Sequence, residues 1–370
     1  MSQGSAVSSR FKSPLHKMTQ TTKSCLWNDS ASKSELAYSI EHGGVGATCN
    51  PVIVVDVLKG EWAEWQGRIR ELISELPTAA EDEISWKLVE EISVGAAQLL
   101  RPIFEAHRGV NGRLSLQTDP RLYRDSKRML EQTVRFNALA PNLIVKIAAT
   151  KAGIAAMQEA TYRGVSVNAT VCFSLPQCLA VAEAIEAGLK RREAEGKDVS
   201  TMGPVCTIMV GRLDDWLKVV HGKLKQQINP EILEWAGIAV FKKTYKIFRE
   251  KGYRARLLAA AFRNDMHWSE LIGGDIVISP PHKWQVRFNA SDIDVIPRID
   301  NPVDPAIVNA LSENFADFRR ANSENGLSFD EFDTFPPARR TLRQFISACY
   351  ELNSLIREVM IPNPDDERLG

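Results

Sequence analysis

The chain has 370 residues, 46 basic and 46 acidic side chains, and a hydrophobic fraction of 44%, which is typical of a globular protein with a large core. A formal net charge of zero argues against nucleic acid as a partner, because nucleic-acid sites are strongly basic. No apolar run approaches the ~20 residues that span a bilayer, so we expect no membrane partner either. The six cysteines form no CxxC pair, which indicates reduced thiols and a cytoplasmic protein.

The chain begins and ends with polar segments. Residues 1–22 are rich in Ser, Thr and Lys and contain no acidic residue. Such a stretch buries too little surface to offset the entropy of ordering it, although a transit peptide has a similar composition. We therefore expect a disordered tail over residues 1–22, one domain over residues 23–361, and a polar tail over residues 362–370.

Between the tails, eight short strand-like runs alternate with helical segments. The runs span residues 23–29, 46–50, 112–118, 142–148, 166–173, 205–211, 255–262 and 275–280. Apolar residues three and four positions apart predict helices over residues 83–107, 122–137, 151–163, 176–192 and 230–252. Further helices, expected over 305–321 and 338–360, would pack on the outside.

Eight strands separated by helices predict an α/β fold, a single (β/α)8 TIM barrel with extra C-terminal helices. An open doubly wound sheet is the competing architecture. That fold would need a glycine-rich phosphate loop after its first strand, and the segment Trp27-Asn28-Asp29-Ser30 contains no glycine.

In the fourth run, Lys146 lies among apolar and small residues. Burial lowers the pKa of a lysine, by up to roughly 3–5 units, and a neutral amine can attack a carbonyl to form a Schiff base. The alternative is an edge-strand lysine whose head reaches water. In a barrel, alternation would turn Ile144 and Ala148 into the lumen with Lys146, and would pack Val145 and Ile147 under the helices.

Polar side chains follow the other predicted strands as well. The carboxyl ends of barrel strands form the active site of such folds, so these side chains should converge on one mouth. They are a carboxylate, several amides and hydroxyls, and two guanidiniums, namely Asp29, Asn50, Gln117, Asn168, Thr170, Arg212 and Arg263. Together with an amine, this set predicts a site for a phosphorylated carbonyl compound.

The strand ends also carry seven motifs in order. They are Leu26-Trp27-Asn28-Asp29, Ala47-Thr48-Cys49-Asn50-Pro51, the run from Gly112 to Leu122, Asn142-Leu143-Ile144-Val145-Lys146-Ile147, Val167-Asn168-Ala169-Thr170, Val210-Gly211-Arg212 and Phe262-Arg263-Asn264. These motifs resemble the successive strand-end motifs of transaldolases, from about residue 23 to residue 284. The resemblance implies a class I aldol mechanism with sugar-phosphate substrates, as in the pentose phosphate pathway, and with no cofactor. Lys146 would hold a dihydroxyacetone unit from a ketose phosphate until an aldose phosphate accepts it.

The resemblance also implies roles for the polar residues. Asp29 would exchange the proton of the hydroxyl at the breaking carbon, and Gln117 with Thr170 would hold a water. The amides of Asn50 and Asn168 would bind the dihydroxyacetone hydroxyls, with Thr48 as a supporting residue. The guanidiniums of Arg212 and Arg263 would clamp the phosphate.

Structural alternatives to these roles stay open. Asp29 could instead be the N-cap of the following helix, and the amides of Asn50 and Asn168 could simply satisfy buried neighbours. Arg212 could form a surface pair with Asp214 or Asp215.

Three positions depart from the transaldolase pattern. Gln117 replaces a glutamate, Met209 replaces a phenylalanine in the substrate site, and Ala261 replaces a serine near the phosphate. The related fructose-6-phosphate aldolases carry glutamine at the position of Gln117 but tyrosine at that of Met209. The alternatives are therefore a lyase that releases free dihydroxyacetone and a weakly active or silent sugar-phosphate-binding protein. The histidines show no metal-ligand spacing, so we expect no metal, and a homodimer is possible.

Overall fold

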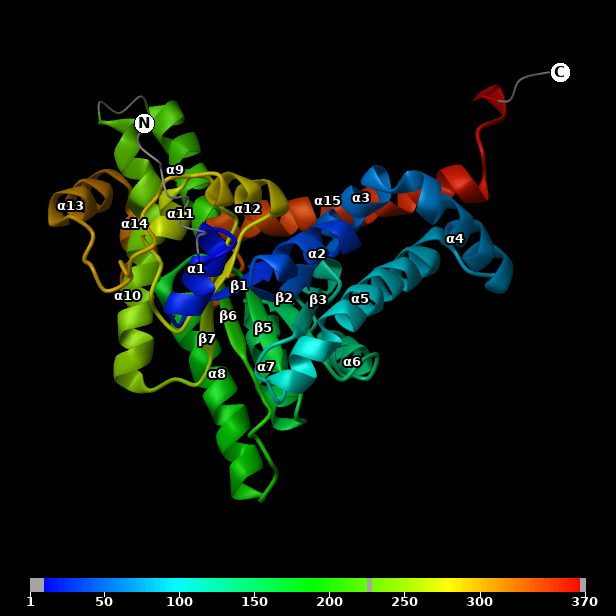
Figure 1. Cartoon of the computed structure of the whole chain (residues 1–370), viewed down its shortest axis with the longest axis horizontal. Helices are drawn as coiled ribbons and strands as arrows, with labels where there is room; N and C mark the ends of the chain where they lie inside the picture. The colour runs from blue at the N-terminus through cyan, green and yellow to red at the C-terminus, as the bar shows by residue number, and fades with distance from the viewer. Residues whose placement is uncertain (1–9, 225–227, 367–370) are drawn as a thin grey trace, which may run out of the picture.

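The computed structural model of the protein describes residues 10–224 and 228–366. Its centre is a closed barrel of eight parallel strands in sequence order (Figure 1). The strands are β1 (Cys25–Asn28), β2 (Gly44–Cys49), β3 (Arg113–Gln117), β4 (Leu143–Ala148), β5 (Val167–Cys172), β6 (Val205–Met209), β7 (Arg256–Ala260) and β8 (Val277–Ser279). All eight predicted strands are present, which confirms the barrel and excludes the open sheet.

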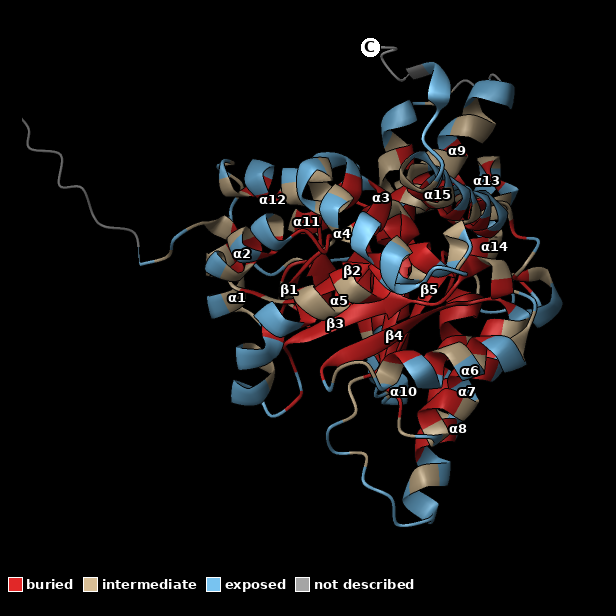
Figure 2. Cartoon of the chain, turned by 90° about the vertical axis from the view of Figure 1, so that its right-hand side faces the viewer, coloured by how far each residue is buried: buried red, intermediate tan, exposed pale blue. Residues whose placement is uncertain are grey.

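Alternation along the strands divides the barrel into an inner and an outer core. A small inner cluster fills the lumen and consists of Trp27, Ile144, Val205, Leu258, Ala260 and Val277. Val145 and Ile147, one residue out of phase with Ile144, belong to the main core between strands and helices, as predicted. Figure 2 shows this buried barrel in red beneath a ring of helices with exposed outer faces.

Helices follow each strand and surround the barrel. They are α2 (Lys33–Glu41), α3 (Pro51–Gly60), α4 (Trp62–Glu75), α5 (Glu81–Ala106), α6 (Ser126–Asn137), α7 (Lys151–Tyr162), α8 (Leu175–Ala194), α9 (Val210–Leu224), α10 (Ala236–Lys251), α11 (Met266–Ser269) and α12 (His282–Asn289). Two 3₁₀ turns precede α6 and α10, at η1 (Pro120–Leu122) and η2 (Pro230–Trp235). The predicted helices between strands are confirmed. A helix at α2 was considered only as the one that might follow Asp29, and α3, α4, α9, α11 and α12 were not predicted.

The N-terminal segment is more ordered than its composition predicts. Residues Pro14–Thr21 form helix α1, whose N-cap Ser13 accepts a hydrogen bond from the His16 amide. Leu15 and Met18 are fully buried, and the Met18 sulfur accepts from Trp268 Nε1 at 3.2 Å. The predicted tail over residues 1–22 is therefore wrong for α1, because two apolar side chains dock the helix. Residues 1–9 lie outside the described part.

The C-terminal segment adds α13 (Pro305–Asn314), α14 (Ala316–Ala321), the turn η3 (Phe329–Glu331), α15 (Pro336–Met360) and the turn η4 (Pro364–Asp366). The single helix predicted over residues 305–321 is interrupted at Phe315, whose backbone is extended. Of the polar tail predicted over residues 362–370, residues 362–366 end in η4 and residues 367–370 lie outside the described residues.

Helix α15 does not simply pack on the outside of the barrel. It contacts α3, α4, α5 and α9 and runs over the carboxyl ends of the strands, as Figures 1 and 2 show. A buried stripe that includes Phe345, Leu352 and Ile356 holds it there. The prediction of an outer helix is thus wrong for α15, and this helix contributes side chains to the barrel mouth.

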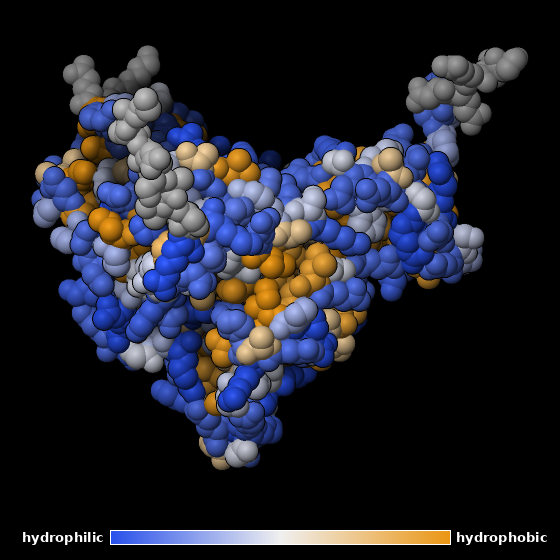
Figure 3. Space-filling view, in the orientation of Figure 1, coloured by the Kyte–Doolittle hydropathy of each residue, from blue (hydrophilic) through white to orange (hydrophobic). Residues whose placement is uncertain are grey.

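The surface has the character expected of a globular protein. Most of the face in Figure 3 is hydrophilic, with the largest apolar area near its centre and smaller ones elsewhere, and apolar atoms normally make up a large part of protein surfaces. Among the described residues, no helix combines the length and the apolar character needed to cross a membrane.

Candidate active site

A cleft of about 670 Å³ opens at the carboxyl ends of the barrel strands. Six of the predicted site residues line it, together with Gln344 and Phe345 of α15. These six are Asp29, Asn50, Lys146, Met209, Arg212 and Arg263. The other four predicted residues, Thr48, Gln117, Asn168 and Thr170, are buried in the barrel. The cleft therefore brings together an amine, a carboxylate and two guanidiniums from strands far apart in sequence.

Lys146 is the only lysine of β4 and is 2% exposed. In the strand register it lies between Gln117 of β3 and Asn168 of β5. Burial lowers the pKa of its ammonium, and the nearby Arg212 lowers it further, while Asp29 acts in the opposite direction. Because the barrel is closed, β4 has no free edge, and the alternative of an edge-strand lysine is wrong.

Asp29 directly follows β1 at the rim of the lumen. Its Oδ1 accepts a hydrogen bond of 2.6 Å from Thr48 Oγ1 on β2. The following helix α2 begins at Lys33 with Ser32 at its N-cap position, so the alternative that Asp29 is the N-cap is wrong. Thr48 thus holds a carboxylate that faces the same cleft as Lys146.

Asn50 has a structural contact as well as a place in the cleft. It is the N-cap of α3, and its Oδ1 accepts from the amides of Val52 at 2.9 Å and Ile53 at 3.1 Å. A proline follows it at the first helical position, which suits a helix start. Since its oxygen is occupied, Asn50 can serve a ligand mainly as an N–H donor.

Asn168 is fully buried and already paired inside the barrel. Its Nδ2 donates to Ser115 Oγ at 3.0 Å, and its Oδ1 accepts from Thr207 Oγ1 at 2.7 Å. These contacts favour the structural alternative that the sequence left open for this residue. Ser115 and Thr207 were not predicted, although both lie at inward positions of β3 and β6 and alternation could have identified them.

Gln117 carries an unsatisfied polar atom. Its Oε1 is buried and has no hydrogen-bond partner among the described residues. Thr170 Oγ1 has a weak contact of 3.9 Å with the Met209 sulfur. An unpaired buried carbonyl costs roughly 1–3 kcal/mol, so a bound water or a substrate hydroxyl that donates to Gln117 would be favoured here.

Arg212 stands at the start of α9 and enters the cleft. One terminal nitrogen donates to Gln344 of α15, and the guanidinium lies 5.5 Å from the centre of the Phe345 ring. Its Nε is buried and unpartnered in the described structure. Burial, followed by repulsion from Arg263, lowers the pKa of Arg212 to about 10. An anion would relieve both effects, which makes this a phosphate-type position.

Arg263 is more exposed and has an acidic partner. Its Nε donates to Asp215 Oδ2 at 2.9 Å, so the surface pair considered for Arg212 belongs to Arg263 instead. The backbones of Gly211 and Ala261 lie close together beside this arginine. A side chain on Gly211 would meet the Ala261 carbonyl oxygen at 2.2 Å, so glycine is needed there, and Ala261 itself has a left-handed backbone with a φ of 63°.

A buried pair behind Arg263 was missed by sequence reasoning. The amide of Arg263 donates to His267 Nδ1 at 3.0 Å, and His267 Nε2 lies 2.7 Å from Asp214 Oδ2. Both side chains are fully buried, and Asp214 Oδ1 also accepts from the Gly237 amide at 2.8 Å. The accepting Nδ1 requires that Nε2 carry the proton. The pair therefore fastens the loop of Arg263 to the helix of Arg212.

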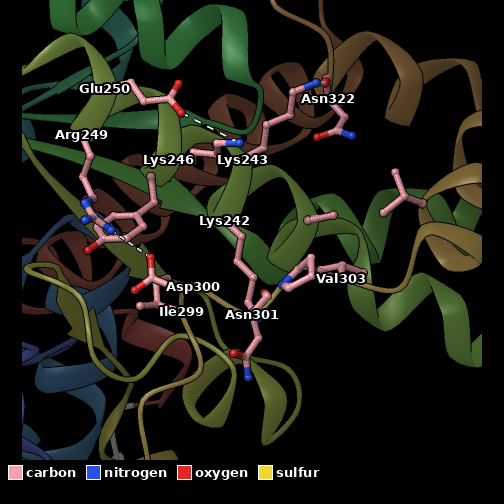
Figure 4. A pocket seen from close by; sticks show the side chains of 14 residues that line it. Lys242, Lys243, Lys246, Arg249, Glu250, Ile299, Asp300, Asn301, Val303 and Asn322 are labelled. Atoms are coloured by element: carbon pink, nitrogen blue, oxygen red, sulfur yellow. Dashed lines mark hydrogen bonds and ion pairs between the residues drawn. The ribbon is translucent and has the colours of Figure 1, made fainter.

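A second hollow, of about 790 Å³, lies beside α10 and the segment 299–303 (Figure 4). Lys242 Nζ donates to Glu270 and to the carbonyls of Arg298 and Asn301. Arg249 donates to Asp300 at 2.9 Å, as the dashed line in Figure 4 shows. The buried Lys242 is thus engaged in three hydrogen bonds and is not available as a nucleophile, so the smaller cleft at the barrel mouth is the candidate active site.

Comparisons with known proteins show which family the chain resembles. The model of the family described as Transaldolase/Fructose-6-phosphate aldolase matches residues 26–323. A transaldolase of Thermobifida fusca is 31% identical over 258 residues, which cover 67% of this chain and 69% of the relative. A transaldolase of Acidothermus cellulolyticus is 30% identical over 254 residues, and transaldolase 1 of Streptomyces avermitilis is 34% identical over 246 residues. The aligned segments span 64% of each of these two relatives.

Proposed function

The chain belongs to the transaldolase/fructose-6-phosphate aldolase family and is a transaldolase-type enzyme, and on that premise we propose that it transfers a dihydroxyacetone unit between sugar phosphates. The donor is a ketose phosphate and the acceptor an aldose phosphate, the chemistry of the pentose phosphate pathway. Carbon transfer proceeds through a Schiff base on Lys146. The buried position of this lysine in a cleft shared with Asp29 is the observation that carries the proposal.

The covalent steps use the amine and the carboxylate. Neutral Lys146 attacks the ketone carbonyl, and loss of water gives a protonated Schiff base. Asp29 takes the proton of the hydroxyl on the fourth carbon, the bond between the third and fourth carbons breaks, and its electron pair moves into the iminium to form an enamine. The aldose phosphate leaves, the enamine attacks the acceptor carbonyl, and water returns to release the product. A lowered lysine pKa supports the first step because it supplies unprotonated amine.

Phosphate recognition is assigned to the two guanidiniums. The unpartnered buried Nε of Arg212 and the mutual repulsion of Arg212 and Arg263 support this assignment, since a phosphate would satisfy the donor and neutralise the repulsion. Asn50 contributes amide hydrogens to the hydroxyls of the bound unit. Ala261 stands where the transaldolase pattern has a serine, so the phosphate site has one hydroxyl donor fewer but the same positive charge.

Gln117 supports a second candidate function. A glutamine can hold a water through its unsatisfied Oε1, but unlike the glutamate of the transaldolase pattern it cannot take up a proton. The fructose-6-phosphate aldolases, which share the matched family description, resemble this chain at that position. The second candidate is therefore a lyase that releases free dihydroxyacetone to water.

Product analysis separates these functions. The purified protein is incubated with fructose 6-phosphate, with and without erythrose 4-phosphate. Transfer requires product formation that depends on the acceptor, and the lyase gives free dihydroxyacetone without one. If neither product forms while the sugar phosphate still binds, the enzyme proposal is wrong and a silent binding protein remains.

Compartment and assembly are proposed on narrower grounds. The six cysteines are unpaired in the structure, which supports a reducing compartment such as the cytoplasm. A homodimer stays a prediction, and size-exclusion chromatography with light scattering would test it.

A further inference from the structure

Three cysteine thiols meet outside the barrel lumen. Cys172 ends β5, Cys178 lies in the first turn of α8, and Cys206 is the second residue of β6. All three are fully buried. The Sγ atoms of Cys172 and Cys178 are 3.4 Å apart, and the three sulfurs all lie within 4.8 Å of one another. No other group of three or more His, Cys, Asp or Glu side chains in the described residues meets so closely.

The spacing fits three-coordinate binding of one ion. Three sulfurs that each bond one ion at about 2.3 Å lie roughly 3.5–4.0 Å apart, the shorter value when the ion sits above their plane, as arsenic(III) does, and the longer value when it lies in their plane. The 3.4 Å between the sulfurs of Cys172 and Cys178 is close to the shorter value, and the other separations are at most 4.8 Å, so small side-chain rotations suffice. Soft thiolate ligands select soft, thiophilic ions.

The three thiols meet at the start of α8. Cys172 lies two residues before Ser174, the N-cap of α8, a helix with no acidic residue in its first turn. Burial raises the pKa of Cys172, whereas hydrogen bonds from Cys178, Cys206 and the backbone of Ser174 and Phe173 lower it. Burial and the neighbouring thiols raise the pKa values of Cys178 and Cys206.

The charge of the product then selects the ion. Three thiolates carry three negative charges, so a monovalent ion leaves two uncompensated, a divalent ion one and a trivalent ion none. A net charge in an apolar interior is costly, and the described surroundings of the cluster are core residues such as Val171 and Ile208. The neutral complex is therefore the one that this site can bury.

We propose that Cys172, Cys178 and Cys206 form a binding site for one trivalent thiophilic ion, with arsenic(III) as its probe. In the reaction, arsenous acid and three thiols give the neutral arsenic trithiolate and three waters. Three As–S bonds replace three As–O bonds, and nothing is oxidised or reduced. The site is independent of the catalytic proposal.

Binding should stabilise the fold. The ion would link β5, α8 and β6, and a ligand that prefers the native state raises the unfolding temperature. Because the thiols are buried, entry requires local opening at the start of α8, and such openings make binding slow. The effect should therefore develop with incubation time.

The experiment uses the full reduced chain and arsenite. Native mass spectrometry should find one arsenic per chain, and thermal unfolding should shift upward. Each of the substitutions Cys172→Ala, Cys178→Ala and Cys206→Ala removes one ligand and should weaken binding by at least about 10- to 100-fold, because loss of a group that only orients a ligand already costs that much. Cys349→Ala is the matched control, because Cys349 is buried in α15 and should leave binding unchanged.

Other outcomes contradict the proposal. One is that the wild-type protein takes up no arsenic. Another is that Cys349→Ala loses as much arsenic affinity as the cluster variants, and a third is that Zn²⁺ or Cu⁺ binds more tightly than arsenic(III). If a cluster variant fails to fold, slow alkylation of the wild type replaces it. Arsenite should then protect the peptides of these three cysteines, and protection confined to other cysteines would overturn the assignment.

Discussion

At the residue scale, the central feature is a lysine whose charge is buried in a closed barrel. The apolar neighbours of Lys146 indicated burial but left an edge-strand lysine open, and the closed barrel decides for burial, with the residue 2% exposed. The direction of the pKa shift follows from that burial and from Arg212. Sequence could not show Arg212 as a contributor, because the two residues lie far apart along the chain.

We predict that Lys146→Met does not destabilise the protein at neutral pH. Because the folded pKa of Lys146 is lowered, the unfolded chain binds more protons between the folded and ordinary lysine pKa values, and stability of the parent rises with pH in that window. Below the folded pKa, the parent protein bears the full free-energy cost of burying the Lys146 ammonium. The free energy of unfolding of Lys146→Met should therefore exceed that of the parent most at such pH values, and the difference should shrink as the pH rises towards the ordinary lysine pKa. Urea unfolding across pH measures it, with the exposed Lys190→Met as control; an advantage that grows with pH would contradict the burial argument.

Arg212 should matter more for phosphate binding than Arg263. Arg212 is buried with an unpartnered Nε, whereas Arg263 already pairs with Asp215. A lost charge-assisted hydrogen bond is worth roughly 1.5–3 kcal/mol, or about 10- to 150-fold in affinity. Arg212→Ala should raise KM by that factor for phosphorylated substrates and much less for dihydroxyacetone, and Arg263→Ala should give a smaller rise. Steady-state kinetics with both substrate types decides, and equal effects on the two would remove Arg212 from the phosphate site.

Gln117→Glu should accelerate proton-dependent steps. The new carboxylate would occupy the place of an unsatisfied carbonyl oxygen beside Lys146 in the register. General acid–base catalysis contributes ~10²–10⁴-fold when fully used, so a partial gain is measurable. The single-turnover rate of carbinolamine dehydration should rise at neutral pH and acquire a new pH dependence. An unchanged rate and profile would place Gln117 outside the proton path.

At the element scale, two connections assemble the site, and neither is local in sequence. Helix α15 carries Gln344 and Phe345 to Arg212, although its own pattern predicts only an amphipathic helix. The strands were predictable because their apolar runs are short and bounded, and their inward alternation was predictable for the same reason. The helix placement was not, because it depends on which face of the barrel remains uncovered.

The second connection is the pair of His267 and Asp214, which we expect to position Arg263. His267→Ala would leave the fully buried carboxylate of Asp214 without its side-chain partner, and a lost hydrogen bond to a charged group costs roughly 1.5–3 kcal/mol. His267→Gln retains an N–H donor and a carbonyl acceptor in that place. We predict that His267→Ala lowers stability and raises KM for phosphorylated substrates with little change in kcat, and that His267→Gln restores part of both. Urea unfolding and kinetics measure this; a KM unchanged by His267→Ala would make the pair purely structural.

At the scale of the whole molecule, the sequence predicted the barrel and its mouth better than the terminal segments that flank the barrel. Eight runs in order leave few topologies for a parallel sheet, so the order of the strands alone places Lys146, Asp29 and the arginines at one end of the barrel. The N-terminal helix was missed because Leu15 and Met18 are too few to outweigh the polar composition of their segment. The contact partner of Met18 is Trp268, 250 residues away, which the segment itself cannot reveal.

A Schiff base at Lys146 is the central step of the proposed mechanism, and borohydride trapping detects it. The protein is reduced with borohydride in the presence of fructose 6-phosphate, digested, and its peptides are mapped by mass spectrometry. We expect a dihydroxyacetone-sized adduct on Lys146 and none when Lys146→Met, still folded, is treated alike. An adduct on another lysine, or a turning-over enzyme that yields no adduct, would contradict it.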